Sequence, residues 1–107
     1  MNPIIFESRQ LQSDKNNLTL SVNVDAYGGF YALSIYPSEY SKSKFEADNE
    51  TWILETLFPA LEKFVYEGTY LSEDLQKEIG EVSREELITI YEMLVRASSL
   101  GWIRKNA

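Results

Sequence analysis

The spacing of hydrophobic residues changes once along this chain, and that change constrains the fold more than any other feature. In residues 18–25 apolar and polar residues alternate strictly, which predicts a β-strand with one buried face. From Glu50 onward the apolar residues recur at the three- and four-residue spacing of an amphipathic helix. Strands followed by helices predict an α+β fold, in which two or three helices pack on one face of a small sheet.

Three strands are expected before the change of spacing. Gly28 and Gly29 follow the alternating segment and can adopt the positive φ angles of a tight turn. Residues 30–36 are rich in aromatic and β-branched side chains, which predicts the next strand. A further strand is expected over residues 4–11, ahead of a polar turn. We therefore predict a three-stranded antiparallel meander in residues 1–36.

The helical part is predicted to be residues 50–103. Before it, residues 37–49 are rich in Ser, Lys and acidic residues and show little periodicity, so we expect a mobile connection there. The first helical stripe continues in phase across Pro59 and stops at Gly68. A proline inside a helix removes one hydrogen bond and crowds the preceding turn, so this pattern predicts one helix kinked near Phe58 rather than two helices.

Two further helices carry capping signals. Ser72 can cap a short helix that closes at Gly80. Ser83 and Glu86 have the spacing of a capping box, ahead of an apolar run that reaches Gly101.

The 107 residues are interpreted as one domain, because this length and a hydrophobic content of 44% suit a single core.

The residue types that are missing exclude several chemistries. The chain contains no His and no Cys, which removes disulfides, iron–sulfur and zinc–thiolate ligand sets, thiol nucleophiles and His-dependent catalytic triads. Glycine-rich phosphate-binding motifs are also missing, as is the acidic spacing of a calcium loop. We therefore expect no catalytic residue, no metal ligand set and no cofactor, and we interpret the protein as a non-enzyme.

Negative charge is concentrated in one part of the chain. Asp and Glu number 17 against 10 Lys and Arg, which gives a net charge of −7. Residues 1–45 are neutral overall, with four acids and four bases, whereas residues 46–92 carry 13 acids and three bases. This distribution argues against binding to nucleic acid or to an anionic membrane surface. It favours a basic protein as the partner.

The densest acidic segment supplies the candidate partner-binding surface. Acids in the first turn of a helix are favoured by the helix dipole, and this local role suits four of them: Glu73, Asp74, Glu85 and Glu86. It does not explain the remaining acids of the segment. Tyr70 is the candidate interface anchor, because tyrosine combines a large apolar area with a polar tip. The predicted partner-binding residues are Glu67, Tyr70, Glu73, Asp74, Glu78, Glu81 and Glu85.

With its acidic helical half, its candidate anchor Tyr70 and its lack of His and Cys, the chain resembles bacterial toxin immunity proteins. The nearest likeness is to those of contact-dependent growth inhibition and colicin-like systems. The resemblance lies in size, acidity and the order of strands and helices, and it assigns no site residue. It implies a cytoplasmic inhibitor that binds one cognate basic toxin, often a nuclease. The first residues lack the basic and apolar regions of a secretory signal, which also favours the cytoplasm.

Two other functions are compatible with the same sequence. A secretion-type chaperone is also small, acidic and α+β, but it would expose an apolar sheet face to hold an extended segment of its partner. A phage-type DNA mimic would spread carboxylates over most of its surface, whereas residues 1–45 are neutral. An immunity protein is expected to hide the apolar face of its sheet, and to be a monomer or a weak dimer.

Overall fold

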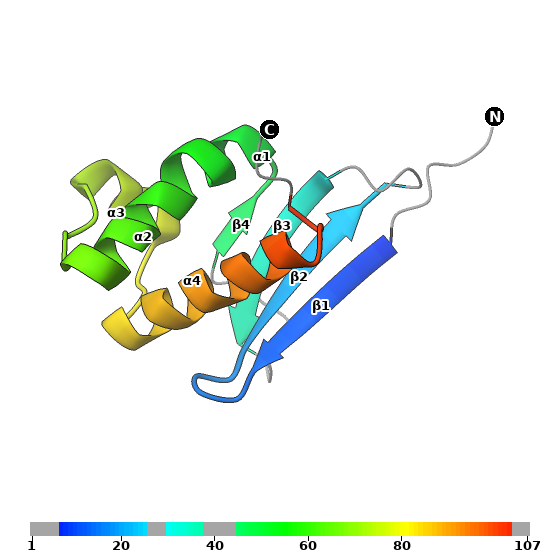
Figure 1. The fold of residues 1–107 in the computed structure, drawn as a ribbon, viewed down its shortest axis with the longest axis horizontal. Coiled ribbons are helices and arrows are strands. Elements are labelled where there is room, and N and C mark those ends of the chain that lie inside the picture. The colour runs from blue at the N-terminus through cyan, green and yellow to red at the C-terminus, as the bar shows by residue number, and fades with distance from the viewer. Residues whose placement is uncertain (1–6, 26–29, 38–44, 104–107) are drawn as a thin grey trace.

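Four antiparallel strands and a helical half make up the computed structural model, which describes residues 7–25, 30–37 and 45–103 (Figure 1). The strands lie side by side in chain order: β1 (Glu7–Ser13), β2 (Leu18–Val24), β3 (Phe30–Pro37) and β4 (Phe45–Ala47). The α+β class and the antiparallel meander are confirmed, but the sheet has one strand more than predicted. β1 extends two residues past its predicted end, and residues 4–6 of that prediction lie outside the described residues.

The additional strand, β4, lies in the segment that the sequence predicts to be a mobile connection. Phe45 pairs with Ile35 of β3, and its ring lies 5.8 Å from the ring of Trp52. A three-residue strand is too short to show a period of two, and burial of this one aromatic residue fixes its place. The prediction is therefore wrong for residues 45–47. Residues 38–44 of the same prediction lie outside the described residues.

The inner face of the sheet is built mainly by β2. Its alternating apolar side chains are all at most 1% exposed: Leu18, Leu20, Val22 and Val24. The polar residues between them point to the outer face, yet Thr19 and Ser21 are buried as well, because β2 has a neighbouring strand on each side. The outer face is polar. Ser8 and Ser21 share a hydrogen bond of 2.9 Å between hydroxyls, and the Gln10 amide donates to the Tyr36 hydroxyl at 3.1 Å.

The first helical run is continuous but irregular. It consists of α1 (Glu50–Trp52), the π-helical segment η1 (Ile53–Leu57) and α2 (Phe58–Glu67), joined by residues with right-handed helical angles. The Phe58 N–H donates to the carbonyl of Ile53, five residues back, which defines the wide turn. Pro59 therefore occupies the first turn of a new α-helical segment, where its missing N–H is not needed. The predicted interruption near Phe58 is present, in the form of a π turn.

The last two helices follow their capping signals. α3 (Glu73–Ile79) begins where the Ser72 hydroxyl accepts from the Leu75 N–H at 3.2 Å. α4 (Arg84–Ser99) begins with a complete capping box between Ser83 and Glu86. Both starts agree with the sequence prediction.

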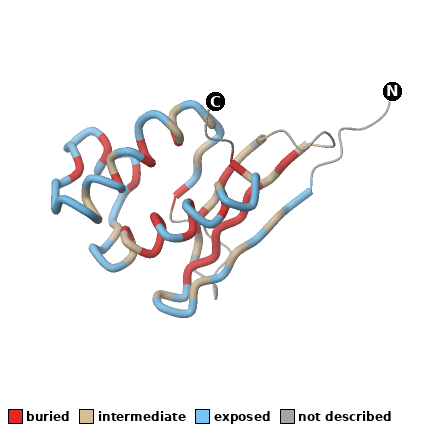
Figure 2. The backbone as a smooth tube through the Cα atoms, viewed as in Figure 1, coloured by how far each residue is buried: buried red, intermediate tan, exposed pale blue. Residues whose placement is uncertain are grey.

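The helices lie on the side of the sheet that its inner face covers. α4 crosses that face over β1 and β2, α2 packs against α4, and α3 lies beside α2 at the left end of the molecule (Figure 1). Buried residues are concentrated in β2 and on the sides of the helices that face inward. Most residues between the end of α2 and the start of α4 are exposed (Figure 2). In the described part of the chain, no helix has the length and apolar character to cross a membrane.

Candidate partner-binding surface

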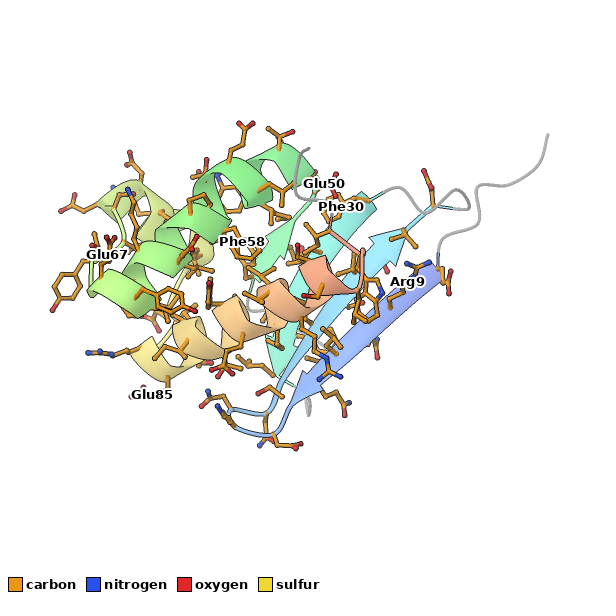
Figure 3. The ribbon with its side chains drawn as sticks, in the orientation of Figure 1. Arg9, Phe30, Glu50, Phe58, Glu67 and Glu85 are labelled. Atoms are coloured by element: carbon orange, nitrogen blue, oxygen red, sulfur yellow. The ribbon has the colours of Figure 1, made fainter. Side chains whose placement is uncertain are left out.

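All seven predicted partner-binding residues lie between the end of α2 and the first turn of α4, and all are exposed. Glu67 is the last residue of α2 and Glu85 lies in the first turn of α4, and both side chains lie at the same end of the molecule (Figure 3). Tyr70 is 87% exposed, more than Tyr66 at 72%. The residues predicted from the sequence therefore lie in one region of the fold.

The six carboxylates of this set have no ion-pair partner among the residues that the structure describes. Within the described residues, the pairs recorded at 3.5 Å join Arg9 to Glu7 and Lys15 to Glu92, and none involves a carboxylate of the predicted set. Carboxylates that are exposed and unpaired keep their long-range attraction for a cationic partner. The surface can therefore steer a basic protein toward this end of the molecule.

A groove of about 680 Å³ opens at the same end, between the C-terminal part of α2, α3 and the loop that leads to α4. Its apolar lining is Phe64, Leu71, Ile79, Val82 and Leu87. Three residues of the predicted set also line it: Tyr70, Glu73 and Glu81. Two bases, Lys77 and Arg84, complete the rim. The groove thus combines an apolar floor with a charged rim.

The remaining predicted residues lie elsewhere around this end. Glu78 lines a smaller hollow of about 250 Å³ together with Glu46 and Asp48. Asp74 and Glu78 are four residues apart on α3 and share one of its faces, whereas Glu73 and Lys77 share another. Glu67, Asp74 and Glu85 line neither hollow. The structure therefore places the predicted residues of α3 on two of its faces, which a linear segment does not indicate.

The α2–α3 connection explains why Tyr70 is exposed. Gly68 ends α2 with a φ of 70°, and the Thr69 N–H donates to the Lys63 carbonyl at 3.3 Å, which turns the chain away from the helix axis. Leu71 is 9% exposed, and its carbonyl accepts from the Gln76 amide at 2.8 Å. Leu71 is thus anchored in the core, whereas Tyr70 beside it is 87% exposed.

Sequence reasoning missed the groove and its bases. The Arg84 guanidinium lies 5.9 Å from the centre of the Phe64 ring, a cation–π contact between α4 and α2. Phe64 belongs to the helical stripe, where the sequence indicates only core packing. The signal that could have located the groove is the pair Leu71 and Val82, two apolar residues outside the helices that flank α3 on both sides.

Tyr66 has a structural role despite its exposure. Its ring meets that of Tyr91 edge to face, with 5.9 Å between the centres. Burial raises the pKa of Tyr91 from 10.0 to about 12, and the hydrogen bond with Tyr66, the charge of Tyr66 and that of Glu62 act in the same direction. Tyr91 is neutral at physiological pH, and its contact with Tyr66 links the exposed surface of α2 to α4.

No group of three or more acidic, His or Cys side chains placed to hold a metal ion occurs among the residues that the structure describes.

No protein-family model, no curated protein and no solved structure matches the chain.

Proposed function

We propose that this protein is a non-enzymatic inhibitor, an immunity protein that neutralises a cognate basic toxin in the cytoplasm. The observation that carries the proposal is the set of exposed carboxylates at the α2–α3–α4 end, which have no ion-pair partner among the described residues. Nucleases are the favoured toxin class, because they present cationic clefts that grip phosphate groups. An anionic surface is complementary to such a cleft.

Charge complementarity acts mainly on the rate of encounter. Opposite charges steer two proteins together, and such steering raises association rate constants towards about 10⁸–10⁹ M⁻¹s⁻¹ at low salt. A fast encounter suits an inhibitor whose target is lethal to the cell that makes it. Tyr70, exposed beside the carboxylates, supplies the short-range contact that retains the partner.

The sheet favours an inhibitor over a secretion-type chaperone. A chaperone of that kind needs an exposed apolar sheet face, whereas here the apolar face of β2 lies under α4. The outer face carries polar side chains, among them Ser8, Gln10 and Tyr36. A DNA mimic is disfavoured because the acids gather on the helical half, and residues 1–45 sum to zero charge.

The test compares charge reversals at the rim of the groove with charge reversals on the other face of α3. One variant carries Glu73→Lys with Glu81→Lys, and the other carries Asp74→Lys with Glu78→Lys. The proposal predicts that a reading frame next to the gene of this protein encodes a secreted protein with a basic C-terminal toxin domain, and that domain is the partner in the assay. Association is measured by stopped-flow fluorescence between 50 and 300 mM NaCl, and protection is measured as growth of cells that express the toxin. We expect at least one variant to associate roughly tenfold more slowly and to lose protection.

The matched control is Asp14→Lys with Glu55→Lys, which changes the net charge equally at exposed sites outside the candidate surface. We expect it to change the association rate less than twofold. Circular dichroism establishes that all three variants are folded. Unchanged rates and an unchanged salt dependence in both acidic-surface variants would contradict the proposal.

A further inference from the structure

The geometry points to a specific occupant for the groove: a large apolar side chain carried on a Lys- or Arg-rich segment of the partner. This inference rests on the proposed function and specifies how the partner is held. The groove volume of about 680 Å³ lies within the usual range of roughly 300–1,000 Å³ for sites that bury an apolar group with a few polar contacts.

The floor of the groove is suited to an aromatic or long aliphatic group. Phe64, Leu71 and Val82 come from three different segments and meet around it. Tyr70 borders the same groove and is 87% exposed, although the adjacent Leu71 is buried. An exposed aromatic side chain next to an apolar depression is typical of the energetic centre of a protein interface.

The lining of the groove carries two acids, Glu73 and Glu81, and two bases, so the preference for a cationic occupant comes from the wider acidic segment around it. Residues 67–86 contain seven acids and two bases. Each base already has a favourable interaction within the protein. Arg84 lies over the Phe64 ring, and Lys77 lies in the last turn of α3, where the helix dipole favours a positive charge. Glu81 lies in the loop between α3 and α4, outside the helices, and forms no ion pair recorded within the described residues. A second copy of this chain would place acids against acids, so a cationic segment is the better fit.

Binding by this surface then has two parts with different responses to salt. Charge contacts at the exposed rim are screened over a Debye length of about 10 Å at 0.1 M salt. Insertion of an apolar side chain is not weakened by screening. The complex is therefore expected to form more slowly at high salt while the contribution of the groove to its lifetime is retained.

Synthetic peptides test the occupant directly on the wild-type protein. The probe is the peptide acetyl-Lys-Gly-Lys-Phe-Lys-Gly-Lys-amide, followed by ¹⁵N–¹H NMR titration. One matched peptide replaces Phe by Ser, and the other replaces every Lys by Glu. We expect the first peptide to shift the amide signals of Leu71, Gly80 and Val82. Each replacement should weaken binding by about tenfold or more, because a large apolar side chain or the favourable charges are lost.

A pair of valine variants locates the site. Val82→Arg places a charge in the groove, and Val95→Arg makes the same change on α4, where Val95 is 38% exposed and does not line the groove. We expect Val82→Arg to abolish the Phe-dependent shifts and Val95→Arg to leave them unchanged. Equal binding of the Phe and Ser peptides to wild-type protein, or shifts that map outside the groove, would overturn the inference even if Val82→Arg fails to fold.

The same variants separate this inference from the proposed function. If folded Val82→Arg binds and neutralises the toxin as wild type does, while the acidic variants fail, the inhibitor function stands and the groove has no part in it. If peptides bind in the groove and no basic toxin binds the protein, the groove chemistry stands and the immunity function fails. A dimer that forms in wild type and is lost in Val82→Arg would assign the groove to a second copy and overturn the inference.

Discussion

Asn16 connects the β1–β2 turn to the start of α4, and its removal should measurably destabilise the protein. The Asn16 amide donates to the Thr89 hydroxyl and to the Glu85 carbonyl, the latter at 3.1 Å. Thr89 is only 2% exposed, and its own hydroxyl donates to the same Glu85 carbonyl at 3.0 Å. One side chain of the hairpin therefore fixes the first turns of α4, the helix that begins at the candidate surface.

The cost follows from the two hydrogen bonds. Each is worth about 0.5–1.5 kcal/mol, so Asn16→Ala should lower the free energy of unfolding by about 1–3 kcal/mol. Asn16→Asp keeps the size of the side chain but replaces the amide donor by a carboxylate that faces a carbonyl oxygen. It should therefore be at least as destabilising as Asn16→Ala.

Urea unfolding followed by tryptophan fluorescence measures this cost. With a slope of about 2 kcal/mol/M, the middle of the usual range, the midpoint should fall by roughly 0.5–1.5 M while the slope stays unchanged. Asp14→Ala is the control, because Asp14 is exposed in the same turn. The reasoning fails if Asn16→Ala shifts the midpoint no further than Asp14→Ala does.

Three further changes test the core, the cap and the buried tyrosine. Leu94→Ala removes a fully buried side chain and should cost about 2–5 kcal/mol in urea unfolding. Ser83→Ala breaks the capping box of α4 and should cost about 0.5–2 kcal/mol, whereas Ser99→Ala at the other end of the helix should cost less. Folding raises the pKa of Tyr91 from 10.0 to about 12, so its contribution to stability is complete below pH 10 and is lost as the pH rises through 12. Thermal unfolding from pH 8 to 12 should therefore show a steeper alkaline loss of Tm in wild type than in Tyr91→Phe, and Tyr70→Phe should behave as wild type.

Features decided by neighbouring residues could be predicted from the sequence. The caps at Ser72 and Ser83 each need only a hydroxyl and an N–H three residues away. The alternation in residues 18–25 identifies β2 because one face of a central strand must be apolar. The wide turn before Pro59 was foreseen as an interruption, since a proline disturbs the turn that precedes it. Its form as a π turn depends on packing that no local pattern specifies.

Features decided by distant contacts could not be predicted in this way. β4 exists because Phe45 pairs with Ile35 and packs on Trp52, and neither contact leaves a pattern in three residues. The predicted partner-binding residues lie in one region of the fold, but those of α3 do not share one face. Leu75 and Ile79 turn their side of α3 into the core, and that rotation places Glu73 and Asp74 on different faces. A sequence shows which acids are present, whereas the docking of α3 decides which of them a partner meets together.

The π turn of η1 has a consequence for changes in chain length. A π turn is an α-helix that has gained one residue, so the loss of exposed Thr56 would restore an ordinary helix without rotating α2 against α4. Pro59 prevents that as long as it remains, because a regular helix would bring its ring against the carbonyl four positions earlier. A variant one residue shorter here can thus keep the same architecture, provided that the deletion and the replacement of this proline occur together.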